Sequence, residues 1–258
     1  MSLHDEYARQ TPFELTFPDP DEAADFFRRV AEEAEARGAQ PDDLQQFLML
    51  ATVGTFVRDL RGSDGPPVAV PEYGALAFHA FHFAGAGRRI DLVSTAAARH
   101  LVGDAPTGQA SEAPGRAGYV QLPQHLFWTS VTPADPPQSV DGFHWTLGAE
   151  GVLYVLLALG LRPDRGLLVV PLPEAPWSDR ETWLMAAMRE EGDDFSSSLP
   201  GADLDNLYAF ESAGEVLKLL TRIFVQLDAL PATACPPATS EANPVPSTFP
   251  FFRVELNA

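Results

Sequence analysis

Three histidines are the side chains in this 258-residue sequence that are best suited to acid–base or metal chemistry. An imidazole gains or loses a proton near neutral pH, and its neutral form is a common metal ligand. His79 and His82 are three residues apart, and His144 follows much later in the chain. If these rings meet in space beside a carboxylate, they form a His/carboxylate site. The carboxylates that could complete such a site are Glu72, Asp91 and Asp141.

The orientation of the histidines depends on the elements that carry them. Residues 76–83 are a short aromatic-rich run before the turn at 85–87, so we expect a strand that forms a hairpin with a strand at 89–93. His79 and His82 would then lie on opposite faces, each hydrogen-bonded and partly buried, and would not chelate one metal. His144 alternates with two aromatic residues and is expected on an exposed or cleft-lining face.

An acidic loop is the second candidate site. Residues 190–206 are rich in the oxygen ligands that hard cations prefer. The spacing of a twelve-residue calcium loop is absent, so a solvated loop is the favoured interpretation and calcium or magnesium binding the alternative. The metal candidates in this loop are Asp193, Asp194, Asp203 and Asp205.

Common cofactor and nucleophile motifs are missing from the sequence. Lys218 is the only lysine, which excludes a P-loop, and its position three residues after Glu215 favours a helical ion pair over Schiff-base chemistry. Cys235 is the only thiol, so a cysteine zinc site and a disulfide framework are excluded. We therefore predict no cofactor.

The net charge of the chain restricts the class of partner that it can bind. The chain has 36 acidic and 17 basic residues, a formal net charge of −19, which disfavours binding to nucleic acid. A composition that is low in lysine and rich in Asp, Glu, Ala and Pro fits a GC-rich bacterial genome, and a salty habitat is one source of such a composition. An acidic face for a basic partner is the alternative.

The compartment follows from three negative features. A lone cysteine fits a reducing compartment, residues 1–10 lack a signal-like apolar segment, and the longest apolar run, 151–161, is too short to span a bilayer. We expect a cytoplasmic protein that has no membrane partner.

Helices are predicted at both ends of the chain. Asp19 caps a helix that stops at Gly38, and residues 41–43 begin another that runs to Leu60. Further helices are expected at 94–102, after Ser178, and at 216–230 after the capping box at Ser212, the last being the central helix.

Strands dominate the middle. Closely spaced apolar segments separated by Gly or Pro turns predict an antiparallel meander. These segments are 119–122, 126–131, 143–147, 152–159 and 167–172. For residues 152–159 a buried helical turn is the alternative, since a short apolar run does not decide its own period.

The sequence thus predicts one α+β domain over residues 1–258, with an antiparallel or mixed sheet covered mainly on one face by helices from both ends. Its parts are a helical pair at 19–60, a β-rich core at 72–172, helices at 178–230, a Pro-rich surface linker at 231–250 and an edge strand at 251–256.

Motifs alone assign no function, and three interpretations stay open. The favoured one is a non-enzymatic bacterial binding protein whose partner is a protein or a small molecule. The second is a metal- or small-molecule-dependent enzyme with a His/carboxylate site, which convergence of the histidines would favour. The third is an acidic regulator or immunity-type protein that binds a basic partner, which a continuous carboxylate face would favour. The oligomeric state is not set by the sequence.

Overall fold

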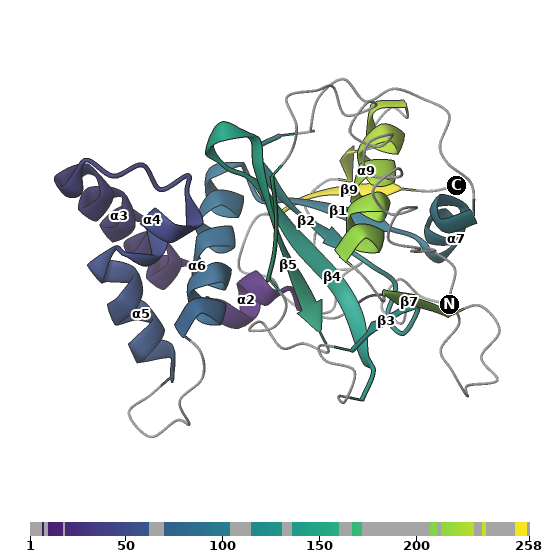
Figure 1. Ribbon diagram of the computed structural model, residues 1–258, viewed down its shortest axis with the longest axis horizontal. Helices are drawn as coiled ribbons and strands as arrows, with labels where there is room; N and C mark the ends of the chain where they lie inside the picture. The colour runs from purple at the N-terminus through teal and green to yellow at the C-terminus, as the bar shows by residue number, and fades with distance from the viewer. Residues whose placement is uncertain are drawn as a thin grey trace.

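A computed structural model describes most of the chain as a mixed β-sheet with helices packed against it (Figure 1), which confirms the predicted α+β class. The strand order is β6 (Leu167–Pro171), β5 (Val152–Leu159), β4 (Gln138–Leu147), β2 (Ala117–Gln121), β1 (Arg89–Val93), β9 (Phe252–Leu256) and β8 (Ala234–Cys235). Strand β3 (Phe127–Thr129) pairs with β4, and β7 (Tyr208–Phe210) pairs with β3. The described residues are 7, 10–17, 19–61, 70–103, 115–130, 136–159, 167–171, 207–210, 213–229, 234–235 and 251–256. Residues 104–114, the helix predicted after Ser178 and most of the linker predicted at 231–250 lie outside them.

The first helices begin at side-chain caps. They are α2 (Pro12–Thr16), α3 (Pro20–Arg37), α4 (Leu44–Leu48) and α5 (Ala51–Arg61). Thr11 and Glu14 form a reciprocal capping box at α2, and the Asp19 carboxylate accepts a hydrogen bond from the Asp21 amide at α3. Gly38 closes α3 in the left-handed conformation, with φ of 61°. These capped starts are where the sequence predicts helices 19–38 and 41–60.

The second predicted helix is interrupted. Asp43 caps α4 by accepting from the Gln46 amide, but α4 ends at Leu48 and α5 starts at Ala51. At the break Leu50 is buried, whereas the side chain of Met49 is 77% exposed. Burial of the apolar residues on both sides of the break therefore overrides the local preference for one continuous helix.

Helix α6 (Val70–Gly85) replaces the strand predicted at 76–83, so the predicted hairpin is wrong. The helix lies between α4 and α5 on one side and the sheet on the other (Figure 1). Residues 74–80 are consequently all buried. A helix that is apolar around most of its circumference loses the 3.6-residue period, and a short apolar run then resembles a buried strand.

The sheet combines both strand directions. Strand β4 (Gln138–Leu147) pairs antiparallel with β5 (Val152–Leu159), which pairs antiparallel with β6 (Leu167–Pro171), as a meander requires. Strand β1 (Arg89–Val93) instead runs parallel to β2 (Ala117–Gln121) and to β9 (Phe252–Leu256).

Three short strands and one helix complete the sheet and its connections. They are β3 (Phe127–Thr129), β7 (Tyr208–Phe210), β8 (Ala234–Cys235) and α7 (Thr95–Gly103), which follows β1. The predicted edge strand at 251–256 is corrected, because β9 lies between β1 and β8. Residues 234–235 of the predicted linker form β8, which contains the only cysteine.

The two faces of the sheet pack against different helices. Ile90, Tyr119 and Leu156 point toward α2–α6, and Val120 and Trp145 point toward α7 and α9 (Ala213–Ala229). This alternation follows from the period of two in a strand. Helices from the two ends of the chain therefore cover opposite faces, which differs from the expectation that they share one.

Helix α9 is buried nearly all round, as its apolar pattern predicts. The polar residues Glu215, Lys218 and Arg222 are each at most 7% exposed. The Arg222 guanidinium donates to the carbonyl oxygens of Leu101 and Val102 in the last turn of α7. A cation at helix C-terminal carbonyls is favourable, so this contact ties α9 to α7. Within the part of the chain that the structure describes, no helix is both long enough and apolar enough to cross a bilayer.

Candidate functional site

Two of the candidate histidines meet between α6 and the sheet. The ring centroids of His79, from α6, and His144, from β4, are 5.9 Å apart, and the ring planes are inclined by 22°. The exposed fractions of the two residues are 0% and 1%. The histidines therefore converge, but at a buried position.

Aromatic and hydroxyl side chains enclose this pair. His79 Nδ1 lies 2.8 Å from the Thr146 hydroxyl of β4, a hydrogen bond whose direction depends on the imidazole tautomer. The His144 ring packs against Tyr119 of β2 at 4.7 Å between centroids and edge-on against Phe83 of α6 at 5.4 Å. We call His79, His144, Thr146 and Tyr119 the buried histidine cluster.

Burial keeps both rings of the cluster uncharged. It lowers the pKa of His144 to about 3, although the Gly118 backbone raises it slightly. The pKa of His79 is lowered well below its usual value, first by burial and then by the neighbouring rings of His144 and His82. Within the described residues, His79 Nε2 and both nitrogens of His144 make no hydrogen bond of normal geometry. The pair is therefore neutral at physiological pH.

The prediction for His144 is half right. It does lie on the face opposite to Phe143 and Trp145, which pack toward α9. It does not line an exposed cleft, because α6 covers its face of the sheet. The strand prediction for residues 76–83 left that face without a covering helix, which is the source of the error.

His82 makes a separate contact one helical turn after His79. Its Nε2 lies 2.8 Å from the Pro41 carbonyl oxygen in the connection between α3 and α4. Burial lowers its pKa, an effect that the Pro41 carbonyl and Asp42 partly offset. The two histidines thus share one helix, whereas the sequence predicts them on opposite faces of a strand.

The candidate carboxylates are placed differently from the histidines. Asp91 pairs in the sheet with Val120 and Val254, whose side chains pack on the α9 face, so its carboxylate lies across the sheet from the cluster. Arg89 Nε lies 2.8 Å from Asp91 Oδ1. Burial nevertheless raises the pKa of Asp91 to about 6, against the opposing effect of Arg89. Asp91 therefore forms no dyad with the histidines.

Among the described side chains, the remaining candidates form no metal centre. Asp141 is buried next to a bulge in β4, where its Oδ1 accepts a hydrogen bond from the Ser139 hydroxyl at 3.4 Å. Burial raises the pKa of Tyr119, and the charge of Asp141 raises it further. Glu72 belongs to α6, but its side chain lies outside the described part. Among the described side chains, no three His, Cys, Asp or Glu residues gather as metal ligands. The loop carboxylates Asp193, Asp194, Asp203 and Asp205 lie outside the described residues.

Sequence reasoning missed Tyr119 and Thr146 as members of the cluster. Thr146 lies two residues after His144 on the same strand, so alternation could have placed it on the same face. Tyr119 is opposite His144 in the β2–β4 register, and no local signal in the sequence reveals that pairing.

Gly142 is required by the close approach of Tyr119. A methyl group at this position would lie 2.3 Å from the Val120 carbonyl oxygen and 2.5 Å from the Tyr119 hydroxyl oxygen. We expect Gly142→Ala to lower the free energy of unfolding by about 1–3 kcal/mol, the usual cost of overpacking, as measured by urea denaturation.

Gly54→Ala is the matched control for this substitution. Gly54 is exposed on α5 and a methyl group there meets no atom within 4 Å, so the change is expected to stabilise by up to about 1 kcal/mol. Equal effects at the two glycines would contradict the packing of Tyr119 on Gly142.

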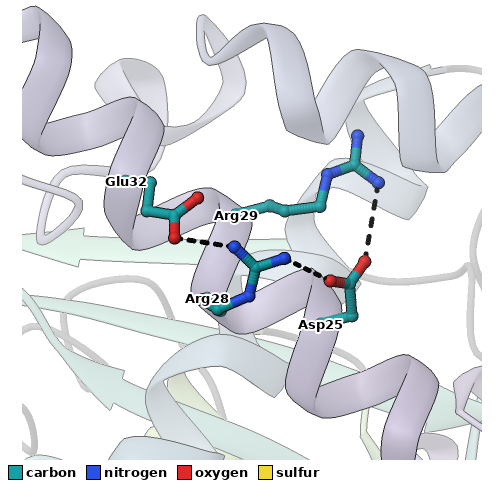
Figure 2. Close-up of polar contacts among 4 residues, drawn as sticks. All are labelled: Asp25, Arg28, Arg29 and Glu32. Atoms are coloured by element: carbon teal, nitrogen blue, oxygen red, sulfur yellow. Dashed lines mark hydrogen bonds and ion pairs between the residues drawn. The ribbon is translucent and has the colours of Figure 1, made fainter.

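The exposed face of α3 is the most highly charged described surface element. The helix contains six carboxylates and three arginines, a net charge of −3. Figure 2 shows Arg28 between Asp25 and Glu32, with Arg29 directed toward the same Asp25. The nitrogen–oxygen distances are 2.5 Å for Arg28–Asp25, 2.7 Å for Arg28–Glu32 and 3.8 Å for Arg29–Asp25. The two carboxylates raise the pKa of the Arg28 guanidinium. The arginines are therefore engaged within the helix.

Comparison with known proteins identifies no family. No protein-family model and no curated protein matches the chain. Among solved structures, the chain is similar to one described as the crystal structure of AcrVA2, with a TM-score of 0.46 and 11% identity over 94% of this chain and 81% of that chain. The likeness is too low for a function to be carried over.

Proposed function

We propose that this protein acts by binding a basic protein partner, and that the outer face of α3 is the docking surface. The observation that carries the proposal is the surplus of exposed carboxylates on that helix. Asp21, Glu22 and Glu35 are exposed and belong to none of the ion pairs made by the arginines of α3. A surface of one sign accelerates and orients the approach of a partner of the opposite sign.

Helix stability alone does not account for this arrangement. Carboxylates in the first turn, such as Asp21 and Glu22, favour a helix because they face the positive end of its dipole. Glu35 lies in the last turn, where a negative charge faces the negative end and is unfavourable. Arg37 pairs with Glu33, at 2.5 Å, and leaves Glu35 facing solvent. An unfavourable exposed charge is the kind that binding to a cation would compensate.

The geometry of the histidines supports binding over the His/carboxylate enzyme. Their convergence is the feature that would favour an enzyme, but His79 and His144 are enclosed by aromatic rings. A general base works best when its pKa lies near the operating pH, and that of His144 is about 3. We regard the cluster as structural. We place the binding in the cytoplasm, in line with the single cysteine.

The test is capture from a lysate of the organism from which the gene comes. The immobilised wild type and the Asp21→Asn/Glu22→Gln/Glu35→Gln variant would be compared at low and high salt, with bound proteins quantified by mass spectrometry. We expect a basic protein that the wild type retains and the variant loses at least 10-fold, because removal of three charges and salt screening both weaken the attraction.

Asp59→Asn is the matched control, because Asp59 is an exposed carboxylate on α5 and its substitution leaves α3 unchanged. It is expected to retain the same protein as the wild type. The same set of proteins on all three columns, or equal losses for Asp59→Asn and Glu35→Gln as single variants, would contradict a docking surface on α3.

A further inference from the structure

The helices α3–α5 are attached to the sheet mainly through α6. Helix α6 contacts α4 and α5 on its outer side and β2, β4 and β5 on its inner side. The inner contact is apolar except at the buried histidine cluster, where His79 of α6 meets Thr146 and His144 of β4. This cluster is therefore a polar contact inside the interface that holds α6 on the sheet.

A proton added to this contact would find no carboxylate partner in the described surroundings. The titratable groups that face the pair are His82 from α6, Tyr119 from β2, Asp141 from β4 and Glu14 from α2. The two carboxylates act on the Tyr119 hydroxyl, whereas the surroundings that act on His79 are burial and two other imidazoles. An imidazolium here would be a buried charge beside a second basic ring, which is strongly unfavourable.

We propose that His79 and His144 form an acid-sensitive latch, which holds α6 on the sheet while both rings are neutral and releases α6, with α3–α5 behind it, when they take up protons. The proposal concerns a conformational device and is independent of the proposed partner. Release would uncover the aromatic face of the sheet around Tyr119, Tyr154 and Leu156.

The opposite face of the sheet should not open with it. Trp145 packs against Phe224 of α9 with ring centroids 4.8 Å apart, and Arg222 ties α9 to α7. Asp91 lies on that face, and its raised pKa means that acid neutralises a buried charge there. Acidification therefore favours the opening of α6. On the α9 side it removes the desolvation penalty of the buried Asp91 charge and so does not favour opening. This asymmetry separates the latch from general acid unfolding.

Hydrogen exchange with mass spectrometry on the full chain tests the latch. Exchange would be followed at pH 7, 6 and 5, with the intrinsic pH dependence of amide exchange divided out. We expect the opening constant of α6 amides to rise about 10-fold per pH unit for each histidine protonated on opening, hence 10- to 100-fold between pH 6 and 5. Amides of α9 should change less than about 2-fold. A uniform rise in both helices, or no rise in α6, would overturn the proposal.

A double variant provides the second arm. His144→Phe retains an aromatic ring against Tyr119 and Phe83, and His79→Gln retains a polar group that can reach Thr146. The variant is expected to lose the pH dependence of α6 exchange, whereas the exposed-residue control His125→Asn, which tolerates the positive φ at that position, keeps it. If α6 exchange in the double variant depends on pH as in the wild type, the latch is contradicted. If the variant does not fold, the comparison of α6 with α9 exchange in the wild type still tests the proposal.

Discussion

Replacing His144 with lysine is expected to lower the free energy of unfolding at pH 7.5 by about 3 kcal/mol or more, a large fraction of the roughly 5–15 kcal/mol that stabilises an ordinary domain. The side chain at this position is 1% exposed and is enclosed by Tyr119, Phe83 and His79. A lysine ammonium would be buried there without a counter-charge among the described neighbours, so it would lose its hydration or force the cluster open. Urea denaturation followed by circular dichroism measures the effect.

His144→Phe is the matched control, because it keeps a ring of similar shape and introduces no charge. Its expected cost is about 1 kcal/mol, in the range of tolerated core substitutions. A lysine variant as stable as the phenylalanine variant would mean that water reaches position 144, and the structural interpretation of the cluster would be wrong.

Acidification from pH 6.5 to 4.5 is expected to lower the free energy of unfolding of the wild type. The pKa values of His79 and His144 are lowered in the folded protein, so both rings stay neutral there and gain a proton on unfolding. Both contributions are complete above pH 6.5 and decrease as the pH falls below it, and that of His144 is lost as the pH falls toward about 3. His82, whose pKa is also lowered, acts in the same direction.

Asp91 opposes this trend. Its pKa is raised from 3.8 to about 6, so between these values the folded protein holds a proton that the unfolded chain releases, and acid stabilises it. His79 and His144 against one aspartate leave a net uptake of about one proton on unfolding, to which His82 adds, so we expect a slope of at least about 1.4 kcal/mol per pH unit below pH 6. Urea titrations at pH 7.5, 6.5, 5.5 and 4.5 measure the slope.

Asp91→Asn separates the two contributions. It removes the opposing group, so unfolding should take up about one more proton. The free energy of unfolding should then fall more steeply below pH 6, by about 1.4 kcal/mol per pH unit more than in the wild type. A free energy of unfolding that is constant or rises from pH 6.5 to 4.5 would contradict the burial of neutral histidines.

The sequence predicts much of the fold where local chemistry decides it. Asp19 and Asp43 mark helix starts because their carboxylates satisfy free amides of the first turn. The strands at 143–147 and 152–159 are confirmed as parts of β4 and β5, since Gly-containing turns bound apolar segments there. Alternation also places His144 on the face opposite to Trp145, as observed.

The errors arise where tertiary burial decides. Helix α6 is buried between a helical layer and the sheet, so residues 76–83 carry no amphipathic period and resemble a strand. That single error hides the layer covering His144 and leads to the expectation of a cleft. The parallel pairing of β1 with β9 joins residues far apart in the chain, and no local pattern encodes such a contact.

The candidate site is less predictable than the fold. His79 and His144 are 65 positions apart, and their approach depends on α6 packing on β4. The rings were identifiable by type, but the protonation that decides their role depends on burial, which only the assembled core provides. The α3 carboxylates could be located from the sequence, whereas the engagement of Arg28 by Asp25 and Glu32 required the helix geometry (Figure 2).

Direct titration of the histidine rings by nuclear magnetic resonance is the measurement that tests the account most directly. Long-range proton–nitrogen spectra of protein labelled at histidine nitrogens would be recorded between pH 7.5 and 5, within the folded range. The account predicts that His79 and His144 remain neutral throughout, as buried structural side chains should. Titration of either ring near pH 6.5 in the folded protein would contradict it and would return the cluster to the list of candidate catalytic sites.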